Sequence, residues 1–283
     1  MKRKLISLCL LPILAFGNWA MDFDEDWAAA SAGPVTLTFE YVSTYPATIT
    51  IGGTAYGQPA DPSKALVDAG DGVFVPWTTN TITLKGKRIR FRGDWRNSNG
   101  CFRELFYSTF GSGHSVTMSG GFDFSGAPVV NMFRATFFRC SGLTGSIPVG
   151  FFGDISGAPA GYMFYYTFYN CSNLTGSIPS GLFGNISGEP AFAMFGATFA
   201  GCSSLTGSIP SGLFGAISGT PAVQMFNATF NGCSKLTGES ALMPDGTTHL
   251  YEQFPTASGT ECDDCYNGAT GLNDYDDIPA EWK

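Results

Sequence analysis

The stretch that decides the fold runs from Met163 to Ala193 and reads MFYYTFYNCSNLTGSIPSGLFGNISGEPAFA. The same pattern recurs at a period of 31 residues, which its cysteine shows most clearly. The cysteine of the successive copies is Cys140, Cys171, Cys202 and Cys233. A fixed period over several copies is the signature of stacked repeats, so the repeat governs the interpretation of the whole chain.

Three copies are complete, and a fourth stops after Gly238, where Glu239 and Ser240 replace a Ser-Ile pair. A degenerate copy precedes them. Its pairs Leu105-Phe106 and Thr109-Phe110 match the start of the unit, which makes that copy 27 residues long. Each copy exposes too much apolar surface to fold alone, so stacking of neighbouring copies is expected to form a continuous core.

The local pattern predicts a short helix, a short strand and a turn in each copy. One stripe of a short helix would hold Met163, Phe164, Thr167, Phe168 and Cys171. A strand is expected over residues 174–178, ended by Pro179, and a glycine-bounded turn or short helical segment over 181–184, with Ile186 beyond it.

Residues 35–100 have a different period. Val35, Leu37, Phe39 and Tyr41 alternate with polar residues, as do Ile89 and Phe91 further on. Alternation of this kind indicates half-buried strands of a small antiparallel sheet. The predicted fold class is therefore α+β, with an N-terminal antiparallel β domain followed by a short leucine-rich-repeat-type solenoid. The predicted segments are a signal peptide at 1–20, a linker at 21–34, the β domain at 35–100, the solenoid at 101–240 and a C-terminal cap at 241–283.

The N-terminus has the features of an export signal. Lys2, Arg3 and Lys4 precede an apolar run from Leu5 to Phe16, which is too short to span a bilayer. Export to the periplasm, the cell surface or the medium is expected, with no membrane span in the mature chain.

The repeat resembles a known family. Thr-Phe-x-x-Cys-Ser-x-Leu-Thr is similar to the Ala-Phe-x-x-Cys-x-x-Leu-Thr core of BspA-like leucine-rich-repeat surface proteins of bacteria. The resemblance covers residues 101–238, and the present unit is longer than the family's usual one. It implies an exported, surface-associated protein of an adhesive kind.

The repeat cysteines Cys140, Cys171, Cys202 and Cys233 are interpreted as a ladder of buried thiols rather than as a metal or redox array, because free cysteine packs like a small apolar residue. Cys262 and Cys265 form a lone C-x-x-C, for which a local disulfide is predicted in an exported protein. The sequence leaves the pairing of Cys101 open, and also whether the acidic C-terminal segment binds calcium. No metal site and no cofactor are predicted.

Two candidate binding surfaces follow from the positions that vary between copies and from the charges. Aromatic side chains outside the core gather in the first complete copies: Phe138, Tyr162, Tyr165, Tyr166 and Tyr169. They are interpreted as a patch for a protein or a sugar, with packing against a neighbouring element as the alternative. Arg88, Arg90 and Arg92 form a basic patch on one strand, suited to an anionic polymer or simply to a solvated strand face.

Composition excludes other classes of function. The net charge of −8 argues against nucleic-acid binding. An enzyme is not predicted, because the repeats hold almost no ionisable groups and the chain has only 2 histidines. The predicted function is a non-catalytic binding or adhesion protein that recognises a protein or glycan on a host or neighbouring cell. A structural, self-associating envelope component is the alternative.

Overall fold

The structure is a computed structural model that describes residues 37–52, 64–96, 101–122 and 124–283. Contacts divide the chain into two compact units, Met1–Gly33 and Pro34–Lys283, and the second unit holds every described residue. The predicted signal peptide at 1–20 and linker at 21–34 lie outside the described residues.

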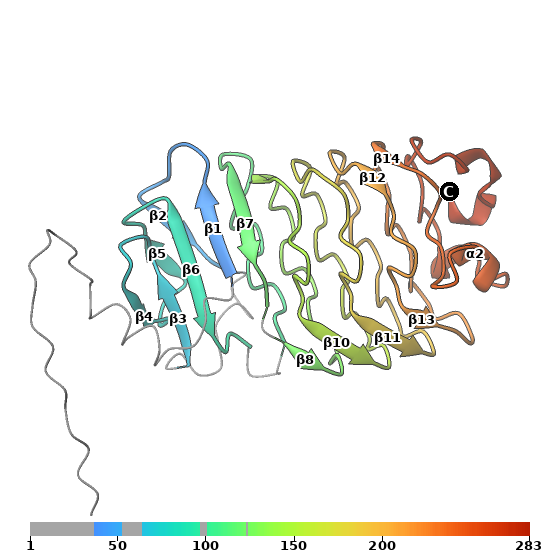
Figure 1. Ribbon diagram of the computed structural model, residues 1–283, viewed down its shortest axis with the longest axis horizontal. Helices are drawn as coiled ribbons and strands as arrows, with labels where there is room; N and C mark the ends of the chain where they lie inside the picture. The colour runs from blue at the N-terminus through green and yellow to red at the C-terminus, as the bar shows by residue number, and fades with distance from the viewer. Residues whose placement is uncertain (1–36, 53–63, 97–100, 123) are drawn as a thin grey trace, which may run out of the picture. The chain divides into compact units, whose positions relative to one another are not determined.

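A six-stranded sheet opens the second unit (Figure 1). Its order is β4-β3-β6-β1-β7-β9, and each pairing is antiparallel except that of β7 with β9. The strands are β1 Leu37–Tyr41, β3 Ala65–Asp68, β4 Phe74–Pro76, β6 Arg88–Gly93, β7 Val116–Gly120 and β9 Leu143–Thr144. A separate antiparallel pair joins β2 Thr48–Thr50 to β5 Thr81–Thr83. Because β7 and β9 follow residue 100, the sheet continues across the domain boundary expected there.

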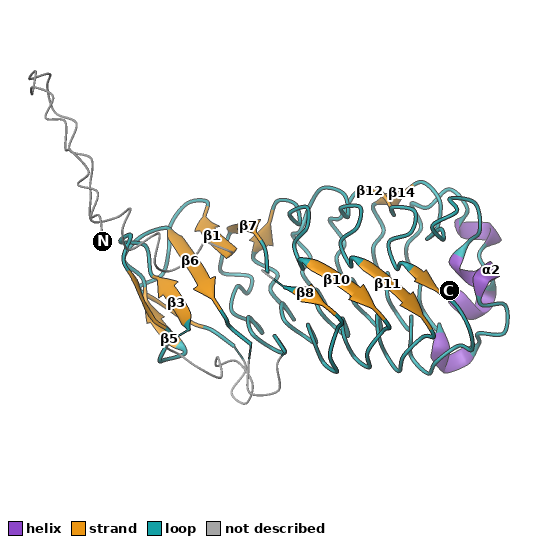
Figure 2. Cartoon of the chain, turned by 60° about the horizontal axis from the view of Figure 1, so that its bottom comes forward, coloured by secondary structure: helices purple, strands orange, loops and turns teal. Residues whose placement is uncertain are grey.

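The repeat copies form strands directly after the glycine-bounded segment expected at 181–184. These strands, at the Ile-Ser-Gly stretch or at Phe-Ser-Gly in the first copy, pair in parallel in the order β13-β11-β10-β8 (Figure 1, Figure 2). Their bounds are β8 Ser125–Gly126, β10 Asp154–Gly157, β11 Asn185–Gly188 and β13 Ala216–Ile217. The expected Leu-Thr-Gly-Ser-Ile strand is reduced to β9, β12 Gly207–Ser208, β14 Leu236–Thr237 and one bridge between Gly145 and Leu174. The glycine after Leu-Thr, such as Gly176 with φ 76°, takes a left-handed conformation that interrupts the extended backbone.

The predicted fold class is therefore wrong. Among the described residues, strands make up 22% and helices 6%, in several mixed sheets of which none forms a solenoid. A leucine-rich-repeat solenoid needs the Leu-Thr stretch of every copy as a strand in one continuous sheet, backed by a helical segment. Here the strand segments are interrupted by glycine, and the stretch expected to be helical is a series of turns.

We call this series the turn ribbon; it covers 162–171 and its counterparts 131–140, 193–202 and 224–233. Every fourth residue of the ribbon has a positive φ, as Tyr162 (57°), Tyr166 (59°) and Asn170 (56°) show. A right-handed helix requires negative φ at each residue, so the pattern excludes the helix.

Backbone hydrogen bonds explain why the ribbon replaces the helix. Alternate amides bond within a copy, as in Tyr165 N–H to Tyr162 C=O at 3.3 Å. The amides between them bond to the next copy, as in Phe164 N–H to Met194 C=O at 2.9 Å. A helix would use all of these groups inside one copy and would leave neighbouring copies joined there by side chains alone.

The core between copies consists of aromatic ladders and buried donors. Phe133, Phe164, Phe195 and Phe226 stack with centroids 5.4, 5.6 and 5.8 Å apart. Thr198 Oγ1 donates to the carbonyls of Phe164 and Phe195 at 2.9 and 2.7 Å, so its buried hydroxyl links two copies. Each copy thus adds apolar burial and satisfied polar groups at the same time.

The first, degenerate copy begins four residues earlier than predicted. Phe102 N–H donates to Met132 C=O at 2.7 Å, as Phe133 N–H donates to Met163 C=O at 2.7 Å. Cys101-Phe102 therefore takes the Met-Phe position, and Leu105-Phe106 takes the Thr-Phe position.

The C-terminal segment contains a further copy that sequence analysis missed. Phe230 N–H donates to Cys265 C=O at 2.7 Å, and the Tyr266 ring stacks on Phe230 at 5.6 Å. Cys265-Tyr266 thus occupies the Thr-Phe position, displaced by an insertion that carries helix α2 Leu250–Gln253. Three short 3-10 helices complete the end of the chain: η1 Gly259–Glu261, η2 Tyr275–Asp277 and η3 Ala280–Trp282. Tyr266 N–H donates to Trp282 C=O at 2.8 Å, and the Trp282 side chain covers this last copy.

Candidate functional site

The turn ribbon presents side chains in pairs to the interior and to the surface. In residues 162–171, Met163, Phe164, Thr167 and Phe168 are buried, whereas the side chains between them are half-buried. The period of four that excludes a helix therefore also brings the outward residues of adjacent copies into register. The sequence-predicted aromatic residues all belong to this outward set.

The structure brings these aromatic residues together. We define the aromatic face as Tyr107, Phe138, Tyr162, Tyr165, Tyr166, Tyr169 and Phe192. Tyr107 stacks on Phe138 at 4.7 Å, and Phe138 stacks on Tyr169 at 4.9 Å. Tyr166 joins this ladder edge-on, 5.7 Å from Phe138 and 5.0 Å from Tyr169.

A second group completes the aromatic face beside that ladder. Tyr165 lies 4.0 Å from Tyr166 and 5.5 Å from Tyr162. Tyr162 in turn lies 5.0 Å from Phe192, which is 42% exposed. Sequence analysis missed Tyr107 and Phe192; Tyr107 could have been found once the first copy was aligned correctly, since it stands 31 residues before Phe138.

Two arginines border the aromatic face. The Arg134 guanidinium lies 4.8 Å from the Tyr162 ring centroid and 5.6 Å from that of Tyr165. Arg139 lies 5.1 Å from the Phe138 ring. Cation–π contact holds these charges against the rings, so the face combines apolar area with positive charge at its edge.

The aromatic face ends where the repeat sequence changes. Ala200 and Asn231 replace the ring of Tyr169 in the following copies. Gly196 stands at the position of Tyr165, and a Cβ there would lie 2.9 Å from Tyr165 Cδ2. The glycine therefore makes room for the Tyr165 ring. Burial, together with a hydrogen bond to Tyr166, raises the pKa of Tyr165 and keeps its phenol protonated.

The basic patch is not an open anion site. Arg88 pairs with Glu40 at 3.1 Å, and Arg90 pairs with Asp68 at 2.6 Å. Arg92 is only 5% exposed and stacks on Phe74, with 3.7 Å between guanidinium carbon and ring centroid. Carboxylates or the Phe74 ring already contact all three guanidinium groups, which weakens the predicted role of these arginines toward an anionic polymer.

The four ladder cysteines are buried and hold free thiols. Each thiol donates to a phenylalanine carbonyl of the preceding copy, as Cys202 Sγ does to Phe168 C=O at 3.1 Å. Burial raises the pKa of Cys140 to about 12 and that of Cys202 well above its ordinary value. Thiolates bind metals and act as nucleophiles, so this ladder is suited to neither task.

The disulfide predicted between Cys262 and Cys265 is absent, and both thiols are free and buried. The reason lies in the additional copy. Cys265 takes the interior threonine position, while Cys262 Sγ donates to Glu281 C=O at 3.4 Å. The two side chains are thus engaged by different neighbours.

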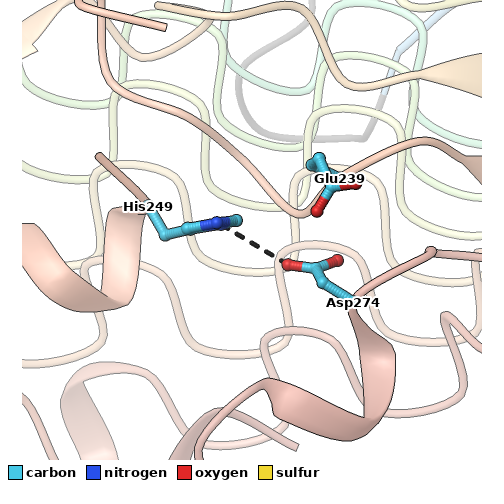
Figure 3. Close-up of side chains that lie close together, drawn as sticks. All are labelled: Glu239, His249 and Asp274. Carbon is cyan, nitrogen blue, oxygen red and sulfur yellow. Dashed lines mark ion pairs between the residues drawn. The ribbon is translucent and has the colours of Figure 1, made fainter. Parts of the chain in front are cut away.

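A polar cluster lies at the C-terminal end of the unit. Its members are Glu239, His249 and Asp274, whose potential ligand atoms lie within 4.8 Å of one another (Figure 3). Ser240 Oγ lies 2.8 Å from His249 Nδ1 and donates to Asp274 Oδ2 at 2.6 Å. Because Ser240 is fully buried and its hydroxyl is held by a carboxylate, this arrangement does not present a serine nucleophile.

Comparison with protein-family models finds no match, and no curated protein or solved structure is significantly similar to the chain. The resemblance to BspA-like proteins therefore stays a prediction that rests on its motif. Among the described residues, no helix has the length and apolar character needed to cross a membrane.

Proposed function

We propose that this chain is a non-catalytic binding protein that recognises its ligand through the aromatic face. The observation that carries the proposal is the continuous array of aromatic rings across successive copies, half-buried from Tyr107 to Tyr169 and ending at the exposed Phe192. Tyrosine contributes large contact area at low entropic cost and is enriched where proteins bind partners. The motif's resemblance to exported surface proteins supports the same class of function and a surface or extracellular location.

The geometry favours a protein ligand over a glycan. Sugars stack on open ring faces, but Phe138 is stacked on both of its faces, and Tyr107 and Tyr169 on one face each. Their outward edges, the tyrosine hydroxyls and the guanidinium groups of Arg134 and Arg139 suit apolar side chains and carbonyl oxygens of a polypeptide. A glycan remains an outcome of the test.

The test is an array of host-matrix proteins, bacterial surface proteins and glycans, probed with the chain and with a Tyr165→Ala/Tyr166→Ala/Tyr169→Ala variant. Loss of two or more hot-spot side chains is expected to weaken binding by at least about 30-fold. The matched control is Tyr45→Ala, which removes an exposed tyrosine (40% exposed) whose ring lies against Tyr41 and does not belong to the aromatic face. Thermal unfolding of both variants verifies that they fold.

Saturable binding to a protein that the triple variant loses and the control keeps would support the proposal. Binding that both variants keep would overturn the proposal, because the site would then lie outside the aromatic face. Concentration-dependent self-association without any ligand, measured by analytical ultracentrifugation, would favour the structural-component alternative instead.

A further inference from the structure

The polar cluster joins three segments that are far apart in the chain. Glu239 follows β14, His249 precedes α2, and Asp274 precedes η2. Figure 3 shows the His249 ring and the Asp274 carboxylate facing each other, with Glu239 beside them. His249 Nδ1 and Asp274 Oδ2 lie 3.4 Å apart.

The surrounding structure holds these side chains in place. Asp274 is 8% exposed, and its Oδ1 accepts from Ser240 N–H at 2.8 Å. The His249 ring stacks on Tyr251 at 4.9 Å, and His249 N–H donates to Glu252 Oε2 at 2.8 Å. Two of the three potential ligands are therefore oriented before anything binds, which lowers the entropic cost of binding.

The charge around the cluster is negative and lacks a strong counter-ion. Among the described residues, the only ion pair of Glu239 or Asp274 is the one between Asp274 and His249. Burial and the nearby charges of Asp274, Glu252, Asp277 and Glu239 raise the pKa of Tyr251. Two carboxylates within 4.8 Å of each other repel unless a cation lies between them.

We propose that Glu239, His249 and Asp274 bind a divalent transition metal ion of the zinc class. One imidazole nitrogen with two carboxylate oxygens is a donor set that favours zinc over calcium or magnesium, which prefer oxygen alone. Ligand atoms about 2.0–2.1 Å from a tetrahedral ion lie about 3.4 Å apart, which matches the His249–Asp274 separation. Ser240 Oγ donates its single proton to Asp274 and orients that carboxylate from outside the coordination sphere. His249 Nδ1, 2.8 Å from the same oxygen, therefore holds a proton in the metal-free chain, and the ion replaces that proton on binding.

Binding would join the end of the fourth copy to the insertion and to the last copy. Glu239 belongs to the first of these, His249 to the second and Asp274 to the third. Because the ligands must be deprotonated, affinity for the ion is expected to weaken in acid.

The test is titration of the full chain with Zn²⁺ in competition with a chromophoric chelator. His249→Gln and Glu239→Gln are each expected to weaken Zn²⁺ binding at least tenfold. Glu239 is exposed, so its variant leaves the fold intact. Asp276→Asn, which removes an exposed carboxylate two residues from Asp274, is the matched control and is expected to bind as the unchanged chain does.

Co²⁺ substitution identifies the donor atoms. The proposal expects visible d–d bands without the near-ultraviolet charge-transfer band of a thiolate. A thiolate band would assign the ion to cysteine and overturn the proposal. So would Zn²⁺ affinity that neither variant changes, Ca²⁺ binding as tight as Zn²⁺ binding, or no Zn²⁺ binding at all. None of these results bears on the aromatic face, so the two proposals fail separately.

Discussion

Substitution of two neighbouring glycines tests how closely the copies approach. Gly181 and Gly184 both have left-handed φ, at 66° and 73°. A Cβ on Gly181 would meet nothing within 4 Å, whereas a Cβ on Gly184 would lie 2.1 Å from the backbone oxygen of Ile155 in the preceding copy. The two alanine variants therefore share the same kind of conformational strain and differ in the steric contact between copies.

The magnitudes follow from these two contributions. Alanine in the left-handed region costs about 1–2 kcal/mol, and the stiffer unfolded chain offsets about 0.4–1 kcal/mol. Gly181→Ala is thus expected to lower the free energy of unfolding by about 1 kcal/mol. Gly184→Ala adds overpacking against backbone that cannot rotate away, about 1–3 kcal/mol more. The shift of β11 away from β10 accounts for this additional loss.

Urea unfolding followed by circular dichroism measures both variants against the unchanged chain. The expected midpoint order is unchanged chain, then Gly181→Ala, then Gly184→Ala, with similar slopes. Thermal unfolding should show the same order, at about 2–4 °C per kcal/mol for a unit of this size. Equal destabilisation by the two substitutions would refute the close approach of Gly184 to Ile155, and with it the parallel register of β10 and β11.

Three further predictions concern the core and the C-terminal copy that closes it. Burial raises the pKa of Cys140 and Cys233 to about 12 from 9.0. The contribution of these thiols to stability is therefore complete below pH 9 and is lost as the pH rises toward 12. Urea midpoints should fall across this range, and they should fall less in a Cys140→Ala/Cys233→Ala variant. The ladder thiols should resist a thiol reagent in the native state and react only on unfolding; reaction at the rate of a free thiol would contradict their burial. Trp282→Ala should lower the free energy of unfolding by about 3–5 kcal/mol, because it removes the indole that covers Phe226 and Tyr266; a urea midpoint equal to that of the unchanged chain would contradict this covering role.

Part of the site could be predicted from the variable positions alone. Residues that differ between copies cannot belong to a common core, so Phe138, Tyr165 and Tyr169 were expected at the surface, and they lie together on the aromatic face. The contribution of Phe192 was not visible, because it depends on how a side chain of the next copy leans toward Tyr162. The partners of the basic patch were not visible for the same kind of reason, since Asp68 and Phe74 reach the arginines only through strand pairing.

The amino-acid sequence by itself determined the period of the repeat and the identity of its apolar positions. Period and composition are local properties, readable residue by residue. It also indicated the alternating strand β1, because a half-buried strand needs only a two-residue pattern.

Only the tertiary structure decided between helix and turn ribbon. The stripe formed by Met163, Phe164, Thr167 and Phe168 suits either conformation, and hydrogen bonds to the next copy, absent from any single copy, select the ribbon. The same bonds recruit Cys265 and Tyr266 into a further copy whose sequence no longer carries the pattern. Hydrogen bonds to backbone groups of another copy can stabilise a conformation that the residues would not adopt in isolation, and these partners are defined only in the folded chain.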